Sequence, residues 1–274
     1  MKNLIILVLI LAATSLYSQR KPKIKGNKAV IEIREELPPF NAIQLNDDLD
    51  IDLQRSTAEG YNITADDNLI DVLKFEVEDG TLVISSFYKI TSKKKLEIVV
   101  NYRELEAITL RDGVIKMEDI LSTDELYINT YGASRLQLNA SAPVTHINME
   151  GQSSGDFNID SDSLNINLKD RVDASIYVVG EKNTLEMHKS ASVRMEGTTD
   201  TLNLRLFENA KFKGEKFEAA VVNATVEETS NARIYAFRDL VLTSKGSART
   251  QLYGDPKITI NEFLDTSELV KRRN

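Results

Sequence analysis

The chain has 274 residues, of which 42% are hydrophobic and 28% charged, and its formal net charge is −8. These proportions are typical of a soluble globular protein. The acidic balance argues against a nucleic-acid partner, because phosphate binding requires a basic surface. The absence of cysteine excludes a disulfide framework and a thiol-linked lipid anchor, so packing and backbone pairing must stabilise the fold.

The first 18 residues have the pattern of a signal peptide. Lys2 precedes an unbroken apolar run from Leu4 to Ala13, which is too short to span a bilayer and has the length of a signal-peptide hydrophobic region. Ser18 is small, as a residue before a cleavage site should be, so we expect cleavage after Ser18. This pattern predicts export to the periplasm, the cell surface or the extracellular space, with no transmembrane segment in the mature chain.

Residues 19–36 are predicted to be a basic leader or linker, because five positive charges fall between Arg20 and Lys28. From Ala29 onward apolar and polar residues alternate with period two, which predicts β-strands.

Two local signals interrupt the predicted strands before residue 95. Asp79 and Gly80 lie between the apolar runs 75–77 and 82–84, which predicts a β-hairpin. Residues 67–73 fit one helical turn, and no longer helical period stands out in the sequence.

After about residue 95 two short phrases alternate, one of the form Leu-x-h-x-h, where h is apolar, and one of the form small-x-h-x-h. The first begins at Leu96, Leu126, Leu164, Leu185, Leu202 and Leu240, and the second at Ser134, Gly155, Ala174, Ala191, Ala210, Ala232 and Ala248. The phrases recur about every 19 residues, a period that indicates a solenoid or an array.

Each such strand has one apolar face that a single unit cannot bury, so the units must pack on one another. A β-sandwich or barrel and a parallel β-helix both meet this requirement. We favour the β-helix, because stacked coils place equivalent residues at the same corner. The sequence then predicts one column of small residues at that corner: Gly155, Ala174, Ala191, Ala210, Ala232 and Ala248.

The predicted fold is an all-β, right-handed parallel β-helix over residues 37–258, with a less regular N-terminal β cap. Residues 259–274 are predicted to be a charged C-terminal tail. Open solenoid ends expose unpaired strand edges, so we expect the prolines at 38–39 to cover one end, and Pro256 with the tail to cover the other.

The order of these segments resembles that of a known family. FNAIQLNDDLDIDLQRS at residues 40–56 and YNITADDNLIDVLKFEVEDGTLVIS at 61–85 precede the repeats, and ARTQLYGDPKI at 248–258 closes them. In this order the chain resembles the family called putative auto-transporter adhesin, head GIN domain. The resemblance implies a secreted β-helical domain on or near the bacterial envelope and assigns no functional residue. Alanine stands at most positions where the family often has glycine, which puts any glycine-dependent contact in doubt.

The sequence contains few residues that suggest catalysis. Residues 151–155 read GQSSG and match the G-x-S-x-G nucleophile elbow, with Ser153 as the nucleophile. The elbow needs a following helix and an acid–histidine pair, whereas a strand pattern follows and only His188 lies downstream, so we interpret the segment as a turn. His146 and His188 are the only histidines, and we expect no histidine metal site and no catalytic residue.

Asp48, Asp50 and Asp52 are the candidates for metal binding, because carboxylate clusters can hold Ca²⁺. They share one face of a predicted strand, on which alternate residues lie about 6.6 Å apart, too far for several to bind one ion unaided. We therefore favour a solvated face and expect no metal or other cofactor.

Tyr177, Tyr235 and Tyr253 are the candidate binding residues, because they recur in the small-residue phrases or directly after them. Tyr177 and Tyr235 alternate with inward isoleucines, so these tyrosines should point outward, where aromatic rings can stack on sugars. The alternative is that they are surface residues with a high strand propensity.

These patterns leave more than one class of function open. The first is a secreted, non-catalytic envelope or surface protein, an adhesin-like module that binds an extracellular glycan or a cell-surface protein. The second is a polysaccharide lyase or hydrolase on a β-helix scaffold, which needs a suitable carboxylate pair in a cleft. The third is a purely structural envelope role. We favour the binding module, because no carboxylate pair stands out.

Overall fold

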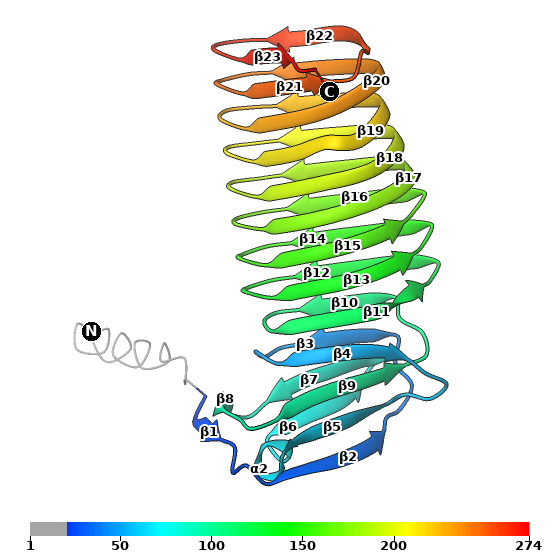
Figure 1. The fold of residues 1–274 in the computed structure, drawn as a ribbon, viewed down its shortest axis with the longest axis vertical. Helices are drawn as coiled ribbons and strands as arrows, with labels where there is room; N and C mark the ends of the chain where they lie inside the picture. Colours follow the sequence, from blue (N-terminus) through cyan, green and yellow to red (C-terminus); the bar gives the residue numbers. More distant parts are fainter. Residues whose placement is uncertain (1–20, 274) are drawn as a thin grey trace, which may run out of the picture.

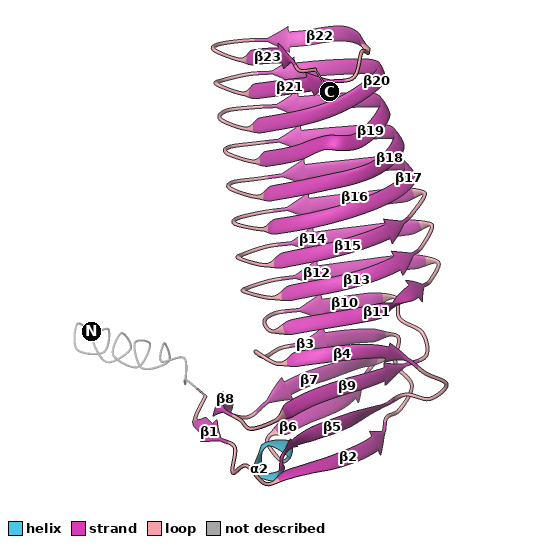
Figure 2. Cartoon of the chain, viewed as in Figure 1, coloured by secondary structure: helices cyan, strands magenta, loops and turns pink. Residues whose placement is uncertain are grey.

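The protein is a β-solenoid, whose coils each contribute two strands and stack in one direction (Figure 1). The computed structural model describes residues 21–273, so the predicted signal peptide lies outside the described residues. Strands dominate, and the described part contains one short helix, α2 (Asp67–Ile70), at the predicted helical turn (Figure 2). The predicted parallel β-helix is confirmed.

The strands form two rows on opposite sides of the core, and the strands within a row pair in parallel above the first coils. Row 1 contains, in stacking order, β7 (Thr81–Ser86), β3 (Ala42–Leu45), β10 (Ala107–Leu110), β12 (Glu125–Thr130), β14 (Val144–Met149), β16 (Ser163–Leu168), the second halves of β17 (Asp173–Met187), β18 (Ser192–Leu206), β19 (Lys211–Val226) and β20 (Asn231–Ser244), and β22 (Lys257–Phe263). Row 2 contains β9 (Leu96–Tyr102), β4 (Asp50–Arg55), β11 (Val114–Ser122), β13 (Arg135–Ser141), β15 (Ser154–Asp160), the first halves of β17 to β20, β21 (Arg249–Tyr253) and β23 (Glu268–Lys271).

The two repeated phrases correspond to the two rows, and their alternation builds the core. In row 1, Ile128, Ile147 and Ile166 stand in register on three successive coils, and all three are buried. Their sequence neighbours point outward, as period two requires. Because every coil adds residues to the same inward columns, each strand buries its apolar face against the coils above and below it.

A four-residue turn joins row 1 to row 2 in most coils, and its second residue adopts the left-handed conformation. This position is glycine in some coils and a charged residue in others, with φ between 58° and 79°: Gly132, Gly151, Asp170, Lys189, Glu208, Glu228, Gly246 and Asp265. The backbone can keep the same turn with either residue type because neighbouring turns bind each other. The carbonyl of Lys189, for example, accepts a hydrogen bond from the amide of Asn209 at 3.0 Å.

The predicted single column of small residues is wrong, because these residues occupy two inward columns. The corner column comprises Ser134, Ser153, Val172, Ala191, Ala210, Ser230 and Ala248, whose carbonyls each bind the amide that begins the next coil's row 2 strand. Its members recur every 18 to 20 residues and are buried.

Gly155, Ala174 and Ala232 lie in the next inward column, where Val193 and Phe212 also fit. Gly155 is small for a local reason, since a Cβ there would lie 2.2 Å from the ring of Phe157.

The N-terminal end of the solenoid is closed by antiparallel strands. β5 (Gly60–Asp66) pairs antiparallel with β9 and is itself covered by β2 (Val30–Glu36). The predicted hairpin is present: β6 (Leu73–Glu78) pairs antiparallel with β7, and Asp79 and Gly80 both have positive φ. The predicted leader over 19–36 needs correction for its described part, because β2 is a strand of this closure and β1 (Lys23–Lys25) pairs in parallel with β8 (Lys89–Ser92) in a separate two-stranded sheet.

A buried carboxylate fastens the first strands to this end. Asp66 accepts hydrogen bonds from the backbone amides of Lys94 at 3.0 Å and of Lys28 and Lys95 at 3.2 Å. These bonds, above all that from Lys94, lower the pKa of Asp66 below its ordinary value, against the opposing effect of its burial. Gly26 passes so close that a Cβ there would lie 1.9 Å from Asp66 Oδ2.

The C-terminal segment also differs from the prediction of a charged tail. Residues 257–271 form one more coil, in which β22 pairs with β20 and β23 pairs with β21. The tail therefore extends the stack, and Pro256 precedes the last coil without covering it. Among the helices of residues 21–273, none is long and apolar enough to cross a bilayer.

A polar residue interrupts one inward column of row 1 and provides a test of the packing. Asn183 stands between Leu164 and Leu202, is 1% exposed, and has no hydrogen-bond partner for either amide atom among the described residues. We expect Asn183→Leu to raise the free energy of unfolding by about 2 kcal/mol, because it removes an unsatisfied polar group and restores the column. Denaturant unfolding measures the change. Thr184→Leu, at the adjacent outward position, should give no gain, and a destabilised Asn183→Leu protein would contradict the description of this column.

The Asp66 cluster predicts an acid-sensitive closure. Because the pKa of Asp66 is lower in the folded state, ionised Asp66 stabilises the fold at pH values above its unfolded-state pKa of about 3.9. This contribution disappears as the pH falls through the folded-state pKa. Asp66→Asn should therefore be less stable than the wild type at about pH 7, and the difference should shrink towards about pH 2. Urea unfolding across this range tests the expectation, which fails if the difference is independent of pH.

Candidate functional site

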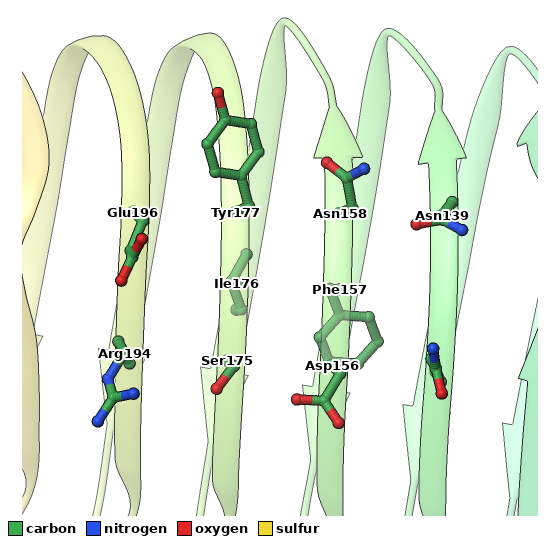
Figure 3. Close-up of a pocket in the computed structure, with 10 residues that line it drawn as sticks. Asn139, Asp156, Phe157, Asn158, Ser175, Ile176, Tyr177, Arg194 and Glu196 are labelled. Atoms are coloured by element: carbon green, nitrogen blue, oxygen red, sulfur yellow. The ribbon is translucent and has the colours of Figure 1, made fainter.

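A shallow groove on the outer face of row 2 is the candidate site. It crosses β13, β15, β17 and β18, and its lining includes Asn158, Tyr177, Arg194 and Glu196. Figure 3 shows these side chains on neighbouring strands, with Tyr177 between Asn158 and Glu196. The groove therefore presents one aromatic ring flanked by amide, carboxylate and guanidinium groups.

The regular stacking of the coils brings these residues together. Asn139, Asn158, Tyr177 and Glu196 are register partners on four successive coils and form one outward column. The neighbouring column, two residues earlier on each strand, contains Gln137, Asp156, Ser175 and Arg194. Successive members of a column lie about 4.8 Å apart.

The depth of the groove follows from the sizes of these side chains. Ser175, Asn139 and Asn158 are short, whereas Tyr177 and Arg194 are long, so a hollow forms beside the longer side chains. Phe157 and Ile176 lie between the two columns and form its floor (Figure 3). Both side chains are buried in the core, which holds the floor in place.

A basic column continues from the groove towards the C-terminal end. Arg194, Lys213 and Arg233 are register partners on three successive coils. Arg233 pairs with Glu215 at 3.0 Å, whereas neither Arg194 nor Lys213 has an ion-pair partner among residues 21–273. This basic column therefore offers cationic groups along the stack on a protein whose net charge is −8.

The three candidate tyrosines all lie on row 2, and Tyr177 and Tyr235 point outward, as their alternation with inward isoleucines predicted. Tyr177 is 51% exposed, and Tyr235 and Tyr253 are partly exposed. Tyr235 and Tyr253 are register partners on adjacent coils, whereas two coils separate Tyr177 from Tyr235. Tyr235 and Tyr253 therefore form a pair, and Tyr177 stands apart from them. Of the three tyrosines, only Tyr177 lines the groove.

The outer face of row 1 carries an aromatic pair of a different kind. Tyr127 stacks on His146 with ring centroids 4.9 Å apart, and its hydroxyl donates a hydrogen bond to Glu125 at 2.5 Å. This hydrogen bond, more than burial, raises the pKa of Tyr127. Tyr127 is exposed, but its ring already has a stacking partner.

The other predicted candidates do not assemble into a site. Asp50 and Asp52 point outward from β4 and Asp48 precedes that strand, and no three His, Asp or Glu side chains of the described chain gather to hold a metal ion. Ser153 is buried in the corner column, where its hydroxyl accepts a hydrogen bond from the hydroxyl of Thr130 at 3.0 Å. His188 instead stacks on Phe207 and contacts Glu186 at 2.9 Å.

Four residues of the groove were not predicted from the sequence: Asn139, Asn158, Arg194 and Glu196. Alignment of the phrases by coil would have placed Asn139, Asn158 and Glu196 in one column with Tyr177, and Arg194 in the column beside it. Only the comparison of successive repeats would have identified these residues. Within a single segment each of them is a common residue for an exposed strand position.

The family model described as "Putative auto-transporter adhesin, head GIN domain" matches residues 39–159 and again residues 144–256. The chain belongs to this family. The resemblance seen in the sequence is confirmed, and the two successive matches agree with a repeated coil. Among curated proteins, none matches the chain.

Solved structures share this head GIN architecture. A putative adhesin from Parabacteroides distasonis has a TM-score of 0.65 and 17% identity, and the match covers 91% of this chain and 97% of that one. A putative adhesin from Parabacteroides merdae has a TM-score of 0.63 and 16% identity, with 92% and 99% covered. A putative lipid binding protein from P. distasonis has a TM-score of 0.63 and 20% identity, with 91% and 99% covered. At these identities the similarity concerns the fold.

Proposed function

We propose that this head GIN protein is exported, is displayed at the cell envelope or surface, and binds an acidic glycan without catalysing a reaction. The observation that carries the proposal is the exposed ring of Tyr177 in a groove that leads into the basic column Arg194–Lys213–Arg233. The family description as an adhesin domain supports a surface binding role.

The groove has the groups that carbohydrate recognition requires. A tyrosine ring offers an apolar face to the C–H groups of a sugar. Beside it, the amides of Asn158 and Asn139 can both donate to and accept from sugar hydroxyl groups, and the carboxylate of Glu196 can accept from them. Coils about 4.8 Å apart also repeat the same geometry along the stack. A linear polymer that lies along this axis would meet equivalent positions on successive coils.

The basic column favours an acidic polymer over a neutral one. Arg194 and Lys213 are free to pair with carboxylate or sulfate groups, because no protein carboxylate within the described residues is paired with them. Guanidinium groups bind such anions through two parallel hydrogen bonds. The overall negative charge of the protein would repel an acidic polymer elsewhere, so binding should be confined to this face.

The open position of the groove favours binding over catalysis. Its polar side chains stand on the outer face of a sheet, in contact with solvent, whereas catalytic sites strengthen charge interactions by excluding water. The corner column, which contains Ser153, is packed inside the coil. An activity screen on acidic polysaccharides would reveal turnover, and turnover that a single groove carboxylate variant abolishes would overturn this part of the proposal.

Tyr177→Ala tests the groove. We expect this variant to weaken binding of polygalacturonate about tenfold, equivalent to about 1.4 kcal/mol, because the stacking surface is lost. Isothermal titration calorimetry measures the affinity. Tyr127→Ala is the matched control, since Tyr127 is also an exposed tyrosine but lies on row 1. Equal losses for the two variants would contradict the assignment of the groove.

Arg194→Gln combined with Lys213→Gln tests the preference for acidic polymers. We expect weaker binding of polygalacturonate and a smaller dependence on salt concentration, because two unpaired cations are lost. Lys182→Gln on the outer face of row 1 removes an exposed cation elsewhere and should change neither quantity. If the double variant binds polygalacturonate as the wild type does, the acidic class of ligand is wrong, whatever the result for Tyr177.

A further inference from the structure

The coil formed by residues 257–271 is built like an interior coil, although within residues 21–273 no strand pairs with its outer side (Figure 1). Ile258, Ile260 and Phe263 are the register partners of the buried residues Leu240, Leu242 and Ser244, so they continue the inward columns. They are nevertheless 44%, 49% and 41% exposed. Apolar residues of the inward columns are therefore exposed to solvent at this end.

The backbone of the last coil is open as well. Among residues 21–273, β22 pairs only with β20, and β23 pairs only with β21. Each strand thus presents a free edge of amide and carbonyl groups on the side away from the stack. Free edges next to apolar side chains associate readily with further strands.

The N-terminal end lacks this character. Its outermost strands, β2 and β6, are antiparallel additions to the first coils, and β2 carries four charged residues in seven. Tyr61 of β5 and Phe75 of β6 stack with ring centroids 4.1 Å apart, and the two rings belong to the core or pack against it. Charged residues on edge strands oppose further pairing, so the N-terminal end of a second copy does not fit the open end.

We propose that the open C-terminal end binds the same end of a second copy of this chain and forms a closed twofold dimer. A partner must offer two free edges at the spacing of the two rows, together with an apolar strip between them. The C-terminal end of another copy offers both. A twofold contact is self-complementary and ends the stack, whereas a head-to-tail contact would continue it into a fibre.

The charges at the open end select one of two possible twofold arrangements. The rim at the turn between β22 and β23 is acidic, with Glu262, Asp265 and Glu268. Lys245 and Arg249 in the coil below hold two of these carboxylates in place, at 2.7 Å and 2.9 Å. The opposite rim, where β22 begins and β23 ends, is predominantly basic, with Lys257, Lys271 and Arg272 around Asp255.

A twofold axis through both rows, perpendicular to the strands and to the stack, reverses the strand direction. It sets β22 antiparallel to the β22 of the second copy and β23 antiparallel to its β23, and it places the acidic rim of each copy over the basic rim of the other. An axis along the strands would instead place acidic over acidic. Opposite charges across paired strands are favourable and like charges are not, so we assign the first arrangement.

Sedimentation equilibrium of the purified chain tests the dimer. We expect twice the monomer mass at micromolar concentration, and at least tenfold weaker association for Ile260→Glu. Ile120→Glu changes an exposed isoleucine of β11, far from the open end, and should leave the dimer intact. A monomeric wild type, assembly that grows without limit, or a dimer that survives Ile260→Glu would overturn the proposal.

A charge exchange keeps the test valid if Ile260→Glu disturbs folding. Lys257→Glu and Asp265→Lys should each weaken the dimer, because each places like charges across the interface. The two changes together should restore association to within a few fold of the wild type. Failure of the double variant to recover, with normal circular dichroism spectra, would overturn the assigned arrangement. These measurements use no glycan, so their outcome is separate from that of the proposed function.

Discussion

The structure depends on one constraint: the strands of successive coils run parallel, in register, and are hydrogen-bonded to each other. A coil whose backbone is hydrogen-bonded to the coil before it and to the coil after it must repeat the same length, and the corner column accordingly recurs every 18 to 20 residues. The same constraint keeps charged residues such as Glu208 and Glu228 in a left-handed turn that glycine would adopt more easily. Pairing along the stack thus outweighs local conformational preference.

Much of the fold could be predicted from the sequence, because its apolar residues recur with two periods, one of two residues and one of about 19. Period two identified the inward side of each strand, as at Ile176 beside Tyr177, and the period near 19 identified the stacking. The choice of corner residue was wrong for a related reason. Gly155 and Ser153 are both inward and two residues apart, so a period of two cannot distinguish their columns. The backbone hydrogen bond to Asp173 shows that Ser153 belongs to the corner, and the position of the Phe157 ring shows that Gly155 makes room for it.

The site was harder to predict than the fold, because it exists only between coils. Tyr177 could be identified from its own phrase, whereas Asn158 and Glu196 gain their meaning from being its neighbours on adjacent coils. Irregularities complicate such an alignment. The register shifts between Gly214 and Glu218, opposite Ile234 and Tyr235, so a strict 19-residue repeat misplaces Tyr235 relative to Tyr177. The spacing of aromatic residues along the sequence therefore does not give their spacing along the stack.

The end of the stack and its outer face are connected by geometry. A twofold axis that passes through both rows keeps row 2 of each copy on the same side of the dimer, so both grooves and both basic columns would face one direction. An axis along the strands would turn the two grooves away from each other. With the assigned axis, one long polymer could contact both copies, and the second contact would form at a high effective concentration without any new interaction. The same parallel stacking that leaves the edges of the last coil unpaired would then also place two grooves on one face of the dimer.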